Sequence, residues 1–169
     1  MTEYANTSFS PRTGDWEDRV RGSFARQPFM VHLGAGLAEV LPGRVVIEAA
    51  HGEHLTQQHG FFHAGVSSAL ADSAGGYAGF SLFPADSSVL TVEYKMNLIS
   101  PAQGDRLRAV GQVVRSGRTI TFCELQVFNR IGDEWRLCAT GQQTLICLAG
   151  RPDTQRGPRG CRMPTGRCS

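Results

Sequence analysis

Asp72 is the residue whose chemical type and surroundings point most directly to a reaction. It is the one carboxylate in the stretch HAGVSSALADSAGG, residues 63–76, where its neighbours are alanine, glycine, serine and leucine. Such a segment is composed for burial, and burial of an ionised carboxylate is costly unless other groups bind it. A functional carboxylate explains this pattern better than the alternative, a structural carboxylate that caps another element.

The beginning of the same segment is suited to bind negative charge if the segment is a helix. The first turn of a helix leaves backbone N–H groups without partners, and the helix dipole adds to their attraction for an anion. Ala64 and Gly65 stand at this start, and Gly65 keeps side-chain bulk away from an approaching oxygen. Their backbone N–H groups therefore form a candidate oxyanion hole.

Asp72 and the helix start cannot act together within one chain. Eight positions separate Ala64 from Asp72, which corresponds to roughly 12 Å along a helix axis. If both serve one reaction, they must come from two subunits whose helices lie antiparallel across a twofold axis. A carboxylate opposite an oxyanion hole suits attack on an acyl carbonyl, directly or through an activated water. Acyl transfer to water by a homodimer with shared active sites is the predicted chemistry.

The composition predicts one domain in the cytoplasm. The chain has 169 residues, of which 41% are hydrophobic, enough to build a single core. No apolar run reaches transmembrane length, and the polar N-terminus has no signal-peptide core, so we expect no membrane contact. Five cysteines without a C-x-x-C pair indicate reduced thiols, with Cys123, Cys138 and Cys147 in the core or sheet. We expect neither a metal nor a cofactor.

The charge is distributed unevenly along the chain. The formal net charge is +2, yet residues 150–169 alone carry five arginines among glycines and prolines. This composition predicts a disordered tail over residues 149–169, and a polyanion-binding arm is the alternative. The remaining chain divides into an N-terminal extension, residues 1–27, and a domain, residues 28–148. The basic excess lies outside any predicted element, so we expect no nucleic-acid partner.

Periodicity and turn residues predict the secondary structure. Residues 15–41 indicate one or two short helices, broken near Pro28 and the glycines that follow, and RVVIEAA at 44–50 indicates a strand. The Ala-rich segment 62–83 is too long for a strand and is predicted as the central helix, ended by Pro84. Four β-rich segments follow, separated by turn signals at 100–105, 116–117 and 131–133: SVLTVEYKMNLI, RLRAVGQVVRS, RTITFCELQVFNR and EWRLCATGQQTLICL.

These elements predict an α+β fold with a curved antiparallel sheet of about five to six strands wrapped around one long central helix. This is the hotdog arrangement. Short turns favour antiparallel neighbours. A sheet that covers the helix on most sides also explains why the helix is small and apolar all round.

Residues of about 28–148 resemble the PaaI-like (phenylacetic-acid-degradation type) acyl-CoA thioesterases of the hotdog superfamily. The family's H-G-G…L-x-D motif appears as His63-Ala64-Gly65 followed by Leu70-Ala71-Asp72. Further similarities are PFMVHLG before the first strand, VEYKMNLISPA after the helix, and RSGRTITF in the hairpin beyond. The resemblance implies hydrolysis of an acyl-CoA to CoA and a free acid, by a homodimer that pairs into a dimer of dimers. Coenzyme A is then part of the substrate.

The resemblance also implies roles for individual residues. Asp72 would be the catalytic carboxylate, as nucleophile or general base, and the N–H groups of Ala64 and Gly65 would bind the thioester oxygen. Gln57 matches an Asn or Gln that contacts the thioester or the water, and Thr91 matches a Ser or Thr near that water. The hairpin Ser116-Gly117-Arg118-Thr119 would lie along the CoA phosphates and pantetheine. Two departures are Ala64, where the family has glycine, and Gln57, where Asn is more frequent.

Other roles are open for several of these residues. His63 and His59 could act as bases, although a histidine just before a helix more often fixes the turn by hydrogen bonding. Gln57 could be a plain loop residue, Arg118 a solvated hairpin charge, and Thr91 a β-forming residue.

Two other functions are compatible with the fold. One is a non-catalytic acyl-CoA-binding module, but the 27 residues before the resemblance are too few for the DNA-binding or partner domain that a sensor would carry. The other is a hydratase or dehydratase, but this chain lacks the catalytic histidine and acid motif of that class. The preference for a thioesterase therefore rests on Asp72 and its surroundings.

Overall fold

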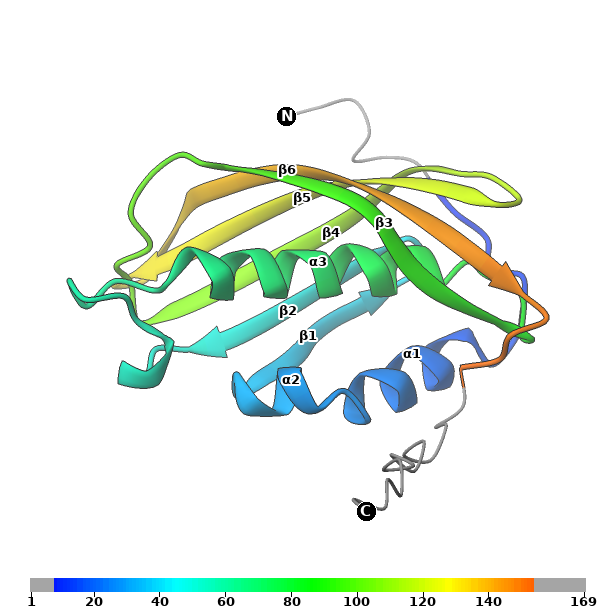
Figure 1. Cartoon of the computed structure of the whole chain (residues 1–169), viewed down its shortest axis with the longest axis horizontal. Helices are drawn as coiled ribbons and strands as arrows, with labels where there is room; N and C mark the ends of the chain where they lie inside the picture. The colour runs from blue at the N-terminus through cyan, green and yellow to red at the C-terminus, as the bar shows by residue number, and fades with distance from the viewer. Residues whose placement is uncertain (1–7, 154–169) are drawn as a thin grey trace, which may run out of the picture.

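The computed structural model describes residues 8–153, in which one antiparallel sheet curves around a long helix (Figure 1). Six strands lie in the order β1-β2-β4-β5-β6-β3, and every neighbouring pair is antiparallel. This confirms the predicted α+β architecture. The elements are α1 (Trp16–Ala25), α2 (Pro28–His32), β1 (Ala35–Leu41), β2 (Arg44–Ala50), the 3-10 turn Glu53–Leu55, α3 (Ala64–Phe80), β3 (Ser87–Leu98), β4 (Arg106–Ser116), β5 (Ile120–Ile131) and β6 (Glu134–Ala149).

The central helix α3 packs against all six strands and can do so because small residues let it approach the sheet closely. A Cβ at Gly111 of β4 would overlap the backbone of α3 at Ala74 and Gly75. The helix is shorter than the predicted range 62–83. It begins after His63, whose side chain caps it, and it ends at Phe80.

The helix is covered on most sides, as expected, but one stripe of α3 stays uncovered within the described residues. The residues of this stripe are partly or fully exposed, whereas those on the other faces are buried. They recur three or four positions apart and so share one face. We call them the open stripe: Gly65, Ser68, Ala69, Asp72 and Gly76.

The strands bury alternate residues against α3. Along β5 the pattern places Cys123, Leu125 and Val127 inward, as a sheet with one covered face requires. The turns predicted at 100–105, 116–117 and 131–133 all lie between strands. The three cysteines expected in the core or sheet are buried free thiols, and burial raises the pKa of Cys123 to about 12.

The sequence prediction for residues 35–41 is wrong. They form the edge strand β1, which pairs with β2, and not the end of a helix. The physical reason lies in the glycines on either side. Gly34 has φ +61° and stops α2, and Gly43 has φ +75° and closes the hairpin between β1 and β2.

Both predicted boundaries of the domain lie within folded structure. Helix α1 belongs to the predicted N-terminal extension, yet its Val20 is fully buried and its Arg19 donates hydrogen bonds to the carbonyls of Phe83 and Ser87. At the other end β6 continues to Ala149, and Asp153 forms a 2.8 Å ion pair with Arg26, the residue that follows α1 as its C-cap. The predicted tail from residue 154 onward lies outside the described residues.

Two kinds of structure are absent from the described part of the chain. No helix in residues 8–153 is long and apolar enough to cross a membrane. In the same residues no three His, Cys, Asp or Glu side chains gather where they could hold a metal ion.

Candidate active site

Asp72 lies at the middle of α3 with one carboxylate oxygen held and the other free. Its Oδ1 accepts a hydrogen bond from Thr91 Oγ1 at 2.7 Å and another from Gln143 Nε2 at 2.6 Å. Gln143 Nε2 also lies 3.0 Å from the Asp72 carbonyl oxygen and 3.0 Å from Thr91 Oγ1. Asp72 Oδ2 accepts no hydrogen bond from residues 8–153. The carboxylate thus has the partners that its apolar setting requires, and it keeps one oxygen available.

Of these two partners, Thr91 was predicted and Gln143 was not. Thr91 comes from β3 and Gln143 from β6, and Gln143 is 2% exposed. A signal for Gln143 does exist in the sequence. In the strand ATGQQTLICL it occupies an inward position, two residues before the buried Leu145, and a polar side chain at such a position needs a partner.

A cavity of about 550 Å³ adjoins Asp72, and we call it the Asp72 cavity. Its wall combines α3 and β3 with the N-terminal helices, and the sequence did not predict this use of α1 and α2. Tyr77 Oη lies 3.4 Å from Ser23 Oγ across this wall, and burial raises the pKa of Tyr77. The lining residues are Ser23, Arg26, Gln27, Pro28, Asp72, Ser73, Gly76, Tyr77, Val89, Leu90, Thr91 and Asp153.

At the start of α3, one of the two predicted oxyanion donors is already occupied. Gly65 N–H donates a 2.9 Å hydrogen bond to Nδ1 of His63, which is therefore the N-cap of the helix. This is the turn-fixing role among the alternatives for His63. Ala64 N–H donates to no acceptor in residues 8–153. Of the predicted pair, Ala64 N–H is the donor that remains free.

A second cavity, of about 420 Å³, lies at this helix start, and we call it the helix-start cavity. Ala64 and the predicted site residue Gln57 both line it, and Gln57 Oε1 accepts a hydrogen bond from His59 N–H. The other lining residues are Phe61, Phe62, Ser67, Leu98, Ile99, Ser100, Pro101, Ala102 and Cys138. The predicted residues therefore divide within one chain. Asp72 and Thr91 meet in one cavity, and Gln57 and Ala64 meet in the other.

Strand β3 connects the two cavities and forms a free edge of the sheet. Leu90 and Thr91, near its beginning, line the Asp72 cavity, whereas Leu98, at its end, lines the helix-start cavity. The strand exposes large apolar side chains: Leu90 is 56% exposed, Val92 60% and Leu98 59%. Long apolar edges of this kind are templates for pairing with another strand.

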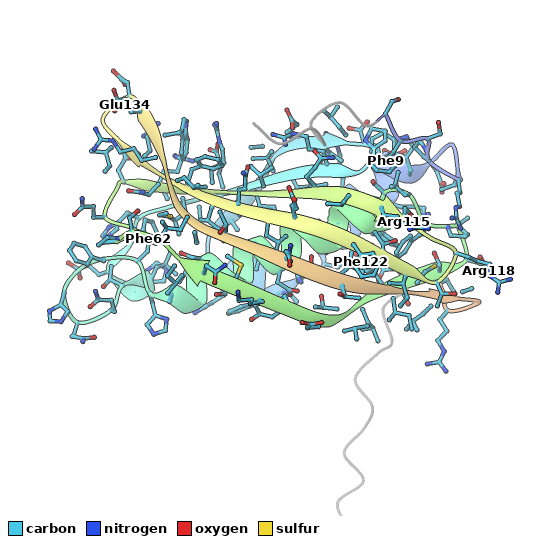
Figure 2. The ribbon with its side chains drawn as sticks, turned by 90° about the horizontal axis from the view of Figure 1, so that it is seen from above. Phe9, Phe62, Arg115, Arg118, Phe122 and Glu134 are labelled. Atoms are coloured by element: carbon cyan, nitrogen blue, oxygen red, sulfur yellow. The ribbon has the colours of Figure 1, made fainter. Side chains whose placement is uncertain are left out.

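The predicted CoA-binding hairpin, residues 116–119, joins β4 to β5 far from the helix start. Figure 2 shows Arg115 and Arg118 at one end of the molecule and Phe62, which precedes the helix, at the other. Arg118 is exposed at the tip of this hairpin. Arg12 joins it from the N-terminal segment by donating a 3.1 Å hydrogen bond from Nη2 to the Gly117 carbonyl. Three arginines thus lie around one hairpin.

The chain is similar in sequence and structure to a family and to solved structures that are described as thioesterases. Residues 59–135 match the family profile described as the Thioesterase superfamily. The crystal structure of a thioesterase family protein from Silicibacter pomeroyi is 46% identical, with a TM-score of 0.79 over 80% of this chain and 99% of that chain.

More distant relatives agree with this result. The 1,4-dihydroxy-2-naphthoyl-CoA hydrolase of Escherichia coli is 28% identical over 92 residues, which make up 54% of this chain and 65% of that protein. The chain spans between 59% and 66% of the length of the curated relatives that it matches. The PaaI protein of the E. coli phenylacetic acid degradation operon, at 18% identity, shares the fold with a TM-score of 0.73 over 82% of this chain and 96% of that chain. With its curved sheet around α3, the chain belongs to the thioesterase superfamily of the hotdog fold.

Proposed function

We propose that the protein hydrolyses an acyl-CoA thioester to CoA and a free acid, with Asp72 as the catalytic carboxylate. The observation that carries the proposal is the hydrogen bonding of this carboxylate. Its Oδ1 is held by Thr91 and Gln143, while Oδ2, beside a cavity of about 550 Å³, has no hydrogen-bond partner in the described residues. A preorganised carboxylate with a free oxygen is what attack on a carbonyl, or activation of a water, requires.

The complete site requires two subunits. We propose that two copies of β3 pair antiparallel about a twofold axis near the middle of the strand, which covers the apolar edge. The beginning of each β3 then lies beside the end of its partner. This brings the Asp72 cavity of one subunit next to the helix-start cavity of the other. The open stripe of α3, made of small residues around Asp72, also becomes available to the partner's helix.

In the shared site, each group has a defined part in the reaction. Asp72 Oδ2 removes a proton from the attacking water, or attacks the thioester carbon itself to give an anhydride that water then cleaves. In both routes the carbonyl oxygen gains negative charge, and the partner subunit's Ala64 donates its free backbone N–H to it. The C–S bond breaks, and CoA leaves as a thiolate that takes up a proton. Gln57 of the partner subunit would flank the thioester or the water.

The hairpin at residues 116–119 supplies positive charge for the CoA phosphates. Arg118 forms no ion pair within residues 8–153, and Arg12 is bonded to the same hairpin. Guanidinium groups are well suited to bind phosphate in pairs of hydrogen bonds. The E. coli relative that carries CoA in its name supports CoA as the carrier of the acyl group.

The Asp72 cavity would hold the acyl group. Its lining includes the hydroxyls of Ser23 and Tyr77, which bond each other, and the amide of Gln27, whose buried Oε1 has no partner within residues 8–153. A long alkyl chain would leave this Gln27 oxygen without a partner. We therefore expect compact acyl groups with polar atoms to be better substrates than long saturated chains.

Thiol release from a panel of acyl-CoAs tests the proposed function. Wild-type protein should release CoA from short, aromatic or polar acyl-CoAs, and Asp72→Asn should reduce kcat by at least about 100-fold, because the amide cannot act as base or nucleophile. The variant is nearly isosteric and should melt as the wild type does. Saturable acyl-CoA binding by the wild type without release of thiol would instead indicate a binding module. An active Asp72→Asn variant would disprove the role of this carboxylate.

A further inference from the structure

Among residues 8–153, Gln143 is the one side chain bonded to the Asp72 carboxylate that the family resemblance did not indicate. It lies on β6 under the middle of α3, and 98% of its surface is covered. Its Nε2 reaches Asp72 Oδ1, the Asp72 carbonyl and Thr91 Oγ1, at 2.6, 3.0 and 3.0 Å. The two hydrogens of this nitrogen are therefore directed at the carboxylate and the carbonyl of Asp72 and at the Thr91 hydroxyl, which also binds that carboxylate.

The acceptor of the same amide has no partner. Gln143 Oε1 is buried, and no donor in residues 8–153 reaches it. The opposite orientation of the amide is unfavourable, because it would place Oε1 against both the carboxylate and the carbonyl of Asp72. The amide thus leaves one buried acceptor unsatisfied while its nitrogen binds Asp72. An unsatisfied buried group is uncommon, and a role in function is one recognised reason for it.

The surrounding helix is shaped to admit this side chain. Gln143 Oε1 lies against Gly75, and a Cβ at that position would overlap both Gln143 and Leu125. Gly75 lies three residues after Asp72 in α3, so the helix leaves space for the amide beneath the carboxylate.

We propose that Gln143 is a positioning residue for the reaction. It fixes Oδ1 of Asp72 together with Thr91 and so directs the free Oδ2 into the Asp72 cavity. This inference rests on the proposed function, because the orientation of the carboxylate matters only if Asp72 takes part in the chemistry. Gln143 is not itself a lining residue of the cavity, although it bonds two that are, Asp72 and Thr91. Its loss should therefore affect kcat and leave KM nearly unchanged.

Gln143→Met and Gln143→Glu test the proposal. Methionine keeps the length of the side chain without a donor, and glutamate keeps its shape while replacing the donor by an oxygen. Both should lower kcat at least 10-fold and change KM less than 2-fold. The matched control is Gln142→Met on the same strand. Gln142 is exposed, so this variant should behave as the wild type.

The same substitutions in an Asp72→Asn background separate positioning from a general structural effect. If Gln143 acts through the carboxylate, Gln143→Met should not lower the residual rate of Asp72→Asn any further, because groups that act as a unit are not additive. An equal further loss of rate in the double variant would overturn the proposal. A wild-type kcat in Gln143→Met or Gln143→Glu would overturn it as well, if Asp72→Asn is inactive. A fully active Asp72→Asn would instead refute the role proposed for Asp72, and a wild type that releases no thiol would refute the proposed function itself. Thermal melting of both Gln143 variants identifies any that does not fold. The conclusion then comes from the folded one, and failure of both to fold would assign Gln143 to stability and overturn the proposal.

Discussion

At the scale of single residues, the two oxygens of Asp72 have different surroundings. Two donors converge on Oδ1, whereas Oδ2 has none in the described part of the chain. In the proposed reaction, this asymmetry would orient the carboxylate before the substrate binds and so lower the cost of orienting it. A carboxylate with both oxygens equally solvated would lack this advantage.

Arg118 allows a test of the CoA end of the site. Removing one partly exposed contact between arginine and phosphate should cost about 1–3 kcal/mol of binding, so Arg118→Ala should raise KM with little change in kcat. Arg136→Ala removes an equal charge, next to its ion-pair partner Glu134 at the other end of the molecule (Figure 2). Steady-state kinetics of both variants should show the KM effect only at Arg118. Equal KM values for the two variants would exclude the phosphate contact.

At the scale of single residues, the sequence predicted those whose type and sequence neighbours already indicate a chemical role. Asp72 could be found because a single carboxylate stands among small residues, and Thr91 because of a family motif. Gln143 could not be assigned to Asp72, since that contact depends on which residue of β6 lies under the middle of α3. The bond from Gly65 N–H to His63 was equally hidden, because it depends on the orientation of a side chain at the helix start.

At the scale of secondary-structure elements, the close contact between α3 and the sheet positions Asp72. The contact depends on glycines where the helix meets β4, β5 and β6: Gly75, Gly79 and Gly111. Sequence periodicity predicted α3 and the four strands after it, because helix length and turn residues are local properties. It missed β1, because residues 35–41 become a strand only through their pairing with β2.

Gly75→Ala tests this packing. The added methyl would overlap Gln143 and Leu125, so the free energy of unfolding should fall by about 1–3 kcal/mol, as for an overpacked core. Gly22→Ala makes the same exchange in α1, where the new Cβ would meet only Arg26 Nη1 at 3.4 Å. It should raise stability by about 0.5–1 kcal/mol, because alanine favours helix. Denaturant unfolding of both variants measures the difference, and a Gly75→Ala protein as stable as the wild type would contradict the close approach.

At the scale of the whole molecule, one chain carries two separate cavities, which in the proposed dimer belong to two different sites. The Asp72 cavity and the helix-start cavity lie toward opposite ends of β3, and β3 is an apolar free edge. The distance along α3, about 12 Å from its start to Asp72, was accessible from the sequence. The exposed edge strand β3, where a partner would pair, was not accessible from the sequence, because strand order depends on the pairing of the complete sheet. A homodimer, and its pairing into a dimer of dimers, remain predictions for light scattering.

The central claim is that Asp72 of one subunit and Ala64 N–H of the other act on one thioester. Ala64→Pro removes that N–H with little effect on the helix, because proline is favoured at the first helical position. His63 has φ −63° and ψ 139°, a conformation compatible with a following proline. Asp72→Asn removes the carboxylate and leaves the helix start intact. Each variant alone should form a folded dimer that is nearly inactive.

Co-expression of the two variants with different tags, followed by purification over both tags, isolates the mixed dimer. One of its two sites then combines an intact Asp72 with an intact Ala64, and the other carries both defects. Thiol release from the best acyl-CoA substrate is the decisive measurement. We predict that the mixed dimer recovers roughly half of the wild-type activity, as expected for one intact interface site of two. A mixed dimer as inactive as its two folded parents would contradict the shared site.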